Sequence, residues 1–145
     1  MRVFVSVVLA VSMLAGPALA RAPEHQHYKR VEKVFSGNKT AIGETIRYPE
    51  GDTVDIRSLV VILMPGETTG WHKHGVPAFG YILSGQVTVD YGVKGKRTYE
   101  EGEGFVDAMN WWHNGINDGD EPVRILVVFM GAQGAEAVIH KPKNE

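Results

Sequence analysis

The chain has 145 residues, of which 43% are hydrophobic and 22% are charged, and its formal net charge is −2. These values are typical of one globular domain, and the nearly balanced charge argues against a nucleic-acid partner or an anionic membrane partner. The chain contains no cysteine, which excludes disulfides, thiolate nucleophiles, thiolate zinc sites and iron–sulfur clusters. Any bound metal must therefore be held by histidine nitrogen or carboxylate oxygen.

The first twenty residues have the pattern of an export signal. Arg2 supplies a positive charge, residues 3–14 are almost entirely apolar, and Ala18 and Ala20 place small residues where signal peptidase reads them. The apolar run is too short to span a bilayer comfortably, although a retained anchor or a buried helix is the alternative. We expect a signal peptide over residues 1–20, cleavage after Ala20, and an exported periplasmic or secreted protein with no membrane segment after cleavage.

The mature chain is expected to begin with an irregular polar arm over residues 21–38 and to continue as short strands. Apolar or alternating runs, separated by clusters of turn residues, occur at 42–48, 54–64, 79–83, 86–91, 97–100 and 123–130. Residues 132–138 can form one helical turn at most, and the chain after Val138 is expected to be solvated. No mature segment sustains a helical period over three turns, so the pattern predicts an all-β sandwich or barrel.

Two histidines, His72 and His74, stand one residue apart in the stretch GWHKHGVPAF. Side chains alternate along a strand, so both imidazoles would lie on one face and could converge on one metal ion. Taken alone this spacing is a weak signal, because solvent-facing strands also carry alternating histidines. The residues that follow, Gly75 to Phe79, offer no carboxylate to complete a site.

A second block of residues extends this pattern. The two blocks are Gly66-x5-His72-x-His74-x10-Gly85 and Gly102-x5-Ala108-x-Asn110-x2-His113-x3-Asn117. Together they resemble the two motifs of the cupin superfamily, G-x5-H-x-H-x3,4-E-x6-G and G-x5-P-x-G-x2-H-x3-N. The family glutamate falls at Ala78 in this chain, so the motif matches with one metal ligand missing.

The resemblance implies a fold and a metal site. The fold is a double-stranded β-helix, or jelly roll, over residues 39–140, with motif blocks at 66–85 and 102–117 and a tail at 141–145. His72, His74 and His113 would then bind one divalent ion, as in cupin dioxygenases that act on thiols and use three histidines without a glutamate. Imidazole suits Fe(II), Mn, Ni, Cu and Zn, so the ligand type does not choose among these metals.

The roles of several other polar residues are not decided by the sequence. Glu44, Glu67 or Asp107 could replace the missing carboxylate, although each could equally be an exposed charge. Tyr48 and Tyr81 are conceivable acid–base groups, but strand alternation is expected to turn Tyr81 away from the metal.

Aromatic and amide side chains close to the histidines in sequence also have two interpretations. The aromatic residues either fill the barrel or a dimer seam, or form the wall of a ligand pocket; they are Trp71, Phe79, Phe105, Trp111 and Trp112. Asn110 and Asn117 either support the histidines or satisfy loop backbone. A rival copper site is conceivable at residues 24–27, where cleavage after Ala22 would place His25 third in the chain.

Three functions follow from these residues. The first is an exported cupin that binds one divalent metal and acts on a small molecule, with oxygen-dependent dioxygenation as the reaction that three histidines suit best. The alternative is a non-catalytic module that binds or senses a small ligand or metal. A third is metal-free epimerase- or isomerase-type chemistry, with His74 or His113 as base and Tyr48 as acid. The expected partner is a small molecule, and the family resemblance suggests a homodimer.

Overall fold

The structure is a computed structural model that describes residues 30–48 and 53–142. The expected signal peptide at 1–20, the rival copper motif at 24–27 and the first part of the arm at 21–38 lie outside the described residues. Within the described residues, the arm from 30 to 38 has no regular secondary structure, as expected. No helix in the described part of the chain has the length and apolar character needed to cross a membrane.

The compact unit that begins at Lys33 consists almost entirely of strands. The described elements are β1 (Val54–Leu63), β2 (His72–Lys73), β3 (Ala78–Ser84), β4 (Gln86–Asp90), a 3-10 turn (Gly92–Lys94), β5 (Lys96–Glu100), β6 (Gly104–Val106), β7 (Asn114–Ile116), β8 (Val123–Ala132) and β9 (Ile139–His140). The predicted all-β class and the expected cupin barrel are confirmed.

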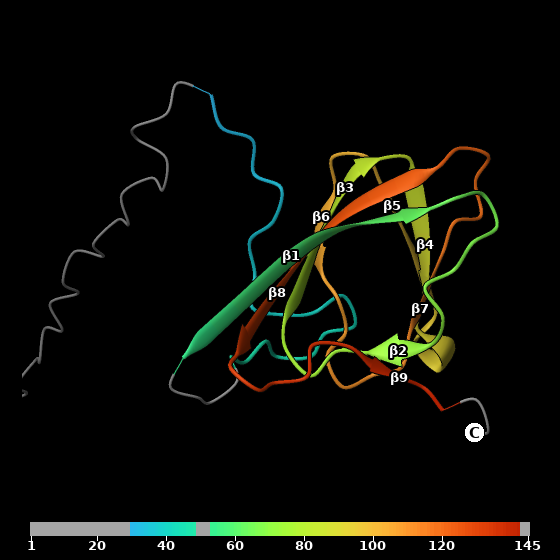
Figure 1. The fold of residues 1–145 in the computed structure, drawn as a ribbon. Helices are drawn as coiled ribbons and strands as arrows, with labels where there is room; N and C mark the ends of the chain where they lie inside the picture. Colours follow the sequence, from blue (N-terminus) through green and yellow to red (C-terminus); the bar gives the residue numbers. More distant parts are fainter. Residues whose placement is uncertain (1–29, 49–52, 143–145) are drawn as a thin grey trace, which may run out of the picture. The chain divides into compact units, whose positions relative to one another are not determined.

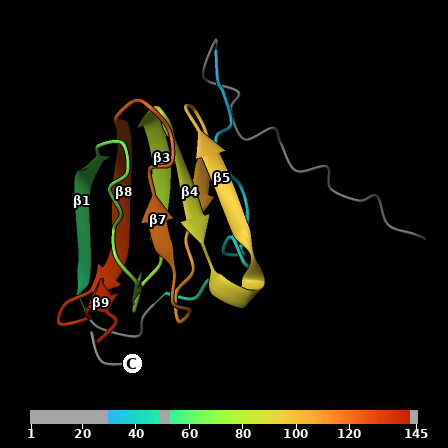
Figure 2. The same ribbon diagram turned by 90° about the vertical axis from the view of Figure 1, so that its right-hand side faces the viewer.

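The strands form three antiparallel sheets, with orders β1-β8-β3-β6, β5-β4-β7 and β2-β9. The four-stranded and three-stranded sheets enclose the interior, and β2-β9 lies at the lower end of the barrel in the view of Figure 1. Figure 2, turned by 90°, shows the three-stranded sheet face on, with β4 between β7 and β5. Neighbours in these sheets are often distant in sequence, as β1 and β8 are, so the barrel is closed by long-range pairing.

The β1-β8 pair shows how alternation builds the barrel wall. All ten residues of β1 pair with β8, from Val54 opposite Ala132 to Leu63 opposite Val123. Leu59, Val61 and Leu63 line the interior cavity, with Leu63 buried and Leu59 still 46% exposed, whereas the intervening Ile62 is exposed and absent from the lining. One face of the strand therefore forms the inner wall, as the period of two requires.

The core fills only part of the interior. Its main buried cluster comprises Leu63, Ile82, Val87, Val89, Tyr91, Phe105, Ala108, Val123 and Ile125. Phe105 enters the interior across Gly80, where an added Cβ would lie 2.8 Å from the Phe105 ring. The small residue at position 80 therefore makes room for an aromatic ring from the neighbouring strand β6.

Two local expectations are wrong. Residues 42–48 form no strand, because residues 40–44 make a tight turn in which the Gly43 amide donates to the Thr40 carbonyl, leaving a single bridge between Lys39 and Thr45. The chain after Val138 is not simply solvated, because Ile139 and His140 pair with β2 as β9.

Candidate metal centre

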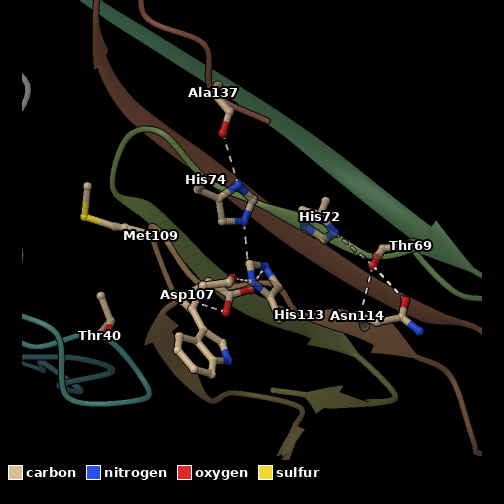
Figure 3. Close-up of polar contacts among 12 residues, drawn as sticks. Thr40, Thr69, His72, His74, Asp107, Met109, His113, Asn114 and Ala137 are labelled. Carbon is tan, nitrogen blue, oxygen red and sulfur yellow. Dashed lines mark hydrogen bonds and ion pairs between the residues drawn. The ribbon is translucent and has the colours of Figure 1, made fainter. Parts of the chain in front are cut away.

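The three predicted ligands come together although His113 is about forty residues from the other two in sequence. His72 lies on β2, His74 follows that strand directly, and His113 immediately precedes β7. The backbones of His72 and His113 exchange two hydrogen bonds of 2.9 Å, and the His74 amide donates to the Met109 carbonyl at 2.8 Å. Figure 3 shows the three rings converging from these segments.

The ring geometry is that of one cluster. Ring centroids are 4.4 Å apart for His72 and His113, 4.9 Å for His72 and His74, and 5.0 Å for His74 and His113. One ligand nitrogen from each ring lies within 4.8 Å of the others, and all three residues are buried. The three histidines are therefore positioned to bind one metal ion.

The backbone also selects which nitrogen of each ring faces the cluster. The Nδ1 atoms of His72, His74 and His113 lie 2.9, 3.1 and 2.9 Å from the carbonyl oxygens of Gly70, Ala137 and Trp111. A carbonyl oxygen can only accept a hydrogen bond, so each Nδ1 must carry the proton. In the neutral ring Nε2 then has a free lone pair, which is the arrangement that metal-binding histidines show.

The Nε2 atom of His113 gives an independent test of whether the residues fit a metal. This atom is buried and has no hydrogen-bond partner among the described residues. A buried polar atom without a partner is costly, and a metal ion would satisfy its lone pair. The donor set of three imidazoles suits the first-row divalent metals.

The surroundings favour the neutral form of two of the rings. Burial lowers the pKa of His74 to about 4, and burial also lowers the pKa of His72. Burial likewise tends to lower the pKa of His113, but the facing carboxylate of Asp107 raises it above its usual value. His72 and His74 are therefore in the metal-binding form near neutral pH.

One of the three candidate carboxylates lies in the cluster. Asp107 Oδ2 is 3.2 Å from His113 Nε2 and 3.9 Å from His74 Nε2. The Glu44 carboxylate instead accepts hydrogen bonds from the Met109 and Asn110 amides, and Glu67 accepts one from the Met64 amide. Of these three residues, only Asp107 lines the cavity that contains the histidines.

The histidines face a cavity of about 320 Å³ with mainly apolar walls. Strands β1, β3, β4 and β8 supply just over half of the lining, which comprises Leu59, Val61, Leu63, Thr69, His72, His74, Ala78, Gly80, Val87, Val89, Phe105, Asp107, His113, Gly115, Ile125, Val127, Phe129, Val138 and His140. This lining includes no lysine or arginine. Sites for small organic molecules are generally of this size and are largely apolar with a few convergent polar groups.

The predicted tyrosines lie elsewhere. The Tyr48 side chain is 73% exposed, and its hydroxyl contacts the sulfur of Met130 on the outside of the barrel. Tyr81 is absent from the cavity lining, whereas Gly80 is part of it, so strand alternation turns Tyr81 away as expected. The placement of Tyr48 removes the acid from the proposed metal-free acid–base mechanism.

Among the aromatic candidates, Phe105 alone lines the cavity. Trp111 donates from Nε1 to the Tyr91 carbonyl, and the ammonium of Lys73 lies 4.9 Å from the Trp112 ring centroid. Trp71 is 40% exposed, and Phe79 packs against Phe35. Four of these five aromatic residues therefore do not form the cavity wall.

The two asparagines act on the loops. Asn117 is completely buried and donates from Nδ2 to the carbonyls of Leu63 and Glu121, while its Oδ1 accepts from the Gly119 amide. Asn110 is exposed. Asn117 therefore ties the loop after β7 to the end of β1 and makes no contact with the histidines.

Sequence reasoning missed one residue at this cavity. His140 pairs with His72 in the β2-β9 ladder, lines the cavity, and has its ring centroid 6.3 Å from that of His72. The only sequence signal is its residue type, because β9 has two residues and no periodicity of its own.

Comparison with known proteins agrees with this fold. The family model described as the cupin domain matches residues 59–129. A gentisate 1,2-dioxygenase from Haloferax sp is 32% identical over 97 residues, which cover 66% of this chain and 24% of that protein. The chain thus matches about a quarter of the length of this relative.

Solved structures show the same fold. The DMSP lyase DddQ from Ruegeria pomeroyi has a TM-score of 0.52 at 20% identity, covering 62% of this chain and 45% of that one. BH2720 from Bacillus halodurans has a TM-score of 0.50 at 18% identity, covering 59% of this chain and 69% of that one. The motif blocks, the antiparallel barrel and the family-model match lead to one conclusion: residues 59–129 of the chain form a cupin domain.

Proposed function

We propose that this cupin binds one divalent metal ion through His72, His74 and His113 and catalyses the dioxygenation of a small aromatic diol, with dihydroxybenzoates as the first class to test. The observation that carries the proposal is the convergence of three backbone-oriented imidazoles on an apolar cavity. The partial match to a gentisate 1,2-dioxygenase supports the substrate class.

The cavity walls support a ring-shaped ligand. Phe105 and Phe129 contribute aromatic surface, and Leu59, Val61 and Val127 contribute aliphatic surface. These side chains would hold a ring by apolar contact and exclude water from the reacting atoms. Because the lining includes no lysine or arginine, an anionic oxygen of the ligand gains no ion pair from such residues and is expected to face the histidine cluster.

The backbone contacts define what the histidines contribute. Each Nδ1–H is held by a carbonyl, so the rings are oriented before a ligand arrives and need no reorganisation during the reaction. A bound iron(II) ion would supply the redox chemistry that oxygen activation requires and a positive charge for an anionic oxygen. The protein's own part is orientation, exclusion of water and selection by shape.

Oxygen consumption tests this function. Iron-loaded protein would be assayed in an oxygen electrode with dihydroxybenzoates, catechols, enediols and thiols, beside a His72→Ala/His113→Ala variant. We expect uptake with an aromatic diol and none with the double variant. If metal-loaded protein consumes no oxygen with any of the four substrate classes, the result would contradict catalysis and favour the non-catalytic binding module.

We also propose that the protein is exported, on the basis of the amino-terminal pattern at residues 1–20. The test is intact-mass analysis of protein from the periplasm or medium of a bacterial host. A mature amino terminus at Arg21 supports export, and an uncleaved protein in the cytoplasm contradicts it.

A further inference from the structure

We propose that Asp107 is the carboxylate ligand of this metal centre, supplied from the end of β6 in place of the glutamate that the cupin motif carries at the position of Ala78. The proposal rests on the metal site proposed above and adds a fourth protein ligand to it. The motif assigns no role to position 107, which is one of five unspecified positions after Gly102.

The distances fit a shared ion. Two ligand atoms that each lie about 2.1 Å from a metal are roughly 3.0 Å apart at a right angle and roughly 4.2 Å apart on opposite sides. Asp107 Oδ2 lies 3.2 Å from His113 Nε2 and 3.9 Å from His74 Nε2. Both distances fall within that range, so an ion held by His74 and His113 can also contact Asp107 Oδ2. The ligand atoms that all lie within 4.8 Å of one another are those of the three histidines without Asp107, so a shared fourth contact needs a small shift of the Asp107 side chain toward His72.

The contact with His113 is not a satisfied hydrogen bond. His113 Nε2 has no hydrogen-bond partner although Asp107 Oδ2 is 3.2 Å away. Because His113 Nδ1 donates to the Trp111 carbonyl, the neutral ring presents only a lone pair to the carboxylate oxygen. A buried carboxylate oxygen this close to Nε2 requires a cation between the two atoms, which is either a proton on a charged His113 or a metal ion.

The other oxygen of the carboxylate is held in place. Asp107 Oδ1 accepts hydrogen bonds from the Tyr91 hydroxyl at 2.9 Å and the Ala108 amide at 2.8 Å. Tyr91 is completely buried, so its ring position is fixed by the core. These two donors direct Oδ2 toward the histidines, which is the usual way that a ligating carboxylate is oriented.

The backbone explains why Asp107 can replace a glutamate at position 78. Strand β3 pairs with β6, and the Asp107 amide donates to the Ala78 carbonyl at 2.9 Å, so the two residues are neighbours across the sheet. Both line the same cavity, and Ala78 has no side chain beyond its methyl group. A carboxylate that starts from 107 instead of 78 therefore reaches the same end of the cavity.

A simple ion pair between Asp107 and protonated His113 is the competing explanation. The two differ in what removal of the charge does to a bound metal. Loss of a ligand lowers metal affinity and changes the coordination spectrum, whereas loss of an ion pair to a protonated histidine leaves the coordination spectrum unchanged.

Cobalt(II) binding to the full chain separates these explanations. Affinity would be measured by competition with a chelator, and ligand number by the visible absorption of the bound cobalt. We expect Asp107→Asn, which keeps the size and the Oδ1 acceptor, to lower cobalt affinity at least tenfold and to change the absorption bands. Glu67→Gln, which removes a charge outside the cavity, is the matched control and should behave as the wild type.

A transplanted carboxylate provides the second variant. Asp107→Ala/Ala78→Glu returns the carboxylate to the motif position, and we expect it to bind cobalt within about threefold of the wild type. Should Asp107→Asn fail to fold, recovery of affinity in the double variant supports the proposal and absence of recovery overturns it.

Two other outcomes distinguish this inference from the function on which it rests. If Asp107→Asn binds cobalt with wild-type affinity and spectrum, Asp107 is not a ligand, while the three-histidine site stands. If the wild type binds no cobalt, the metal site and the Asp107 inference both fall.

Discussion

At the scale of single residues, the site depends on which atom each histidine presents. Carbonyl oxygens of Gly70, Ala137 and Trp111 hold the three Nδ1 atoms and leave Nε2 facing the cavity. The Thr69 hydroxyl oxygen lies 3.4 Å from His72 Nδ1 and accepts a hydrogen bond of 2.9 Å from the Gly115 amide. The ligand atoms are thus selected by main-chain geometry, which substitution of distant side chains should not disturb.

A charge placed in the cavity wall should weaken ligand binding without removing the metal. Leu59→Asp introduces a carboxylate among the lining residues, where it would repel an anionic ligand and lose apolar contact. We expect dihydroxybenzoate affinity, measured by titration calorimetry on metal-loaded protein, to fall at least tenfold.

The same strand offers the control for this variant. Ile62 is 55% exposed and is not among the lining residues, so Ile62→Asp should bind the ligand as the wild type does. Equal affinities for the two variants would show that the ligand does not occupy this cavity.

At the scale of elements, the metal centre is built where short strands and loops meet. β2 and β9 have two residues each, and β7 has three, so little of their stability can come from their own pairing. Asn117 compensates by linking the loop after β7 to the last residue of β1 and to Glu121.

Removing the Asn117 side chain should therefore destabilise the whole fold. Asn117→Ala leaves the buried carbonyl of Leu63 and the Gly119 amide without their side-chain partner. We expect the free energy of unfolding, measured by urea denaturation, to fall by about 2–3 kcal/mol. Asn110→Ala, at an exposed position, should change it by less than about 0.5 kcal/mol; equal losses would contradict this role for Asn117.

The elements that sequence predicted are those with a strong pattern of their own. The run at 123–130 and the alternation at 86–91 appear as β8 and β4, because apolar strand residues pack into the interior. β9 could not be predicted, since it exists only through pairing with β2. The alternating pattern at 42–48 predicted a strand that does not form, because the turn at Gly43 prevents the chain from continuing in extended form.

The sequence predicted those metal ligands that a motif places at fixed offsets, and it could not choose among residues outside the motif. Fixed offsets identified His72, His74 and His113, which the fold brings together. Asp107 could be named as a candidate but not chosen over Glu44 or Glu67, because the choice depends on the β3-β6 pairing beside Ala78. The sequence could not show that Phe105 and Phe129 line the otherwise mainly aliphatic cavity wall while the three tryptophans lie outside it.

At the scale of the whole molecule, the histidines lie where β2 and β9 meet the three-stranded sheet. The core extends up to them, because the Tyr91 ring centroid is 5.8 Å from that of His113. The ligands come from β2 and from the segment before β7. A bound ion would therefore join the β2-β9 sheet to the three-stranded sheet, and it would stabilise the native state but not the unfolded chain.

Metal binding should therefore raise the melting temperature. An ion that binds only the native state at a free concentration one hundred times its Kd adds about 2.7 kcal/mol to stability. For a domain of this size that corresponds to a shift of roughly 10 °C in a thermal scan followed by circular dichroism. The His72→Ala/His113→Ala variant should show no such shift, and an equal rise in both proteins would indicate binding elsewhere.

The most direct test of the metal centre is the metal content of the purified protein. Elemental analysis by mass spectrometry, after loading and removal of free metal, would be made on the wild type and on His72→Ala/His113→Ala, with circular dichroism to show that both are folded. We predict about one ion per chain in the wild type and almost none in the variant. Equal metal content in the two folded proteins, whether one ion or none, would contradict a metal centre built on these histidines.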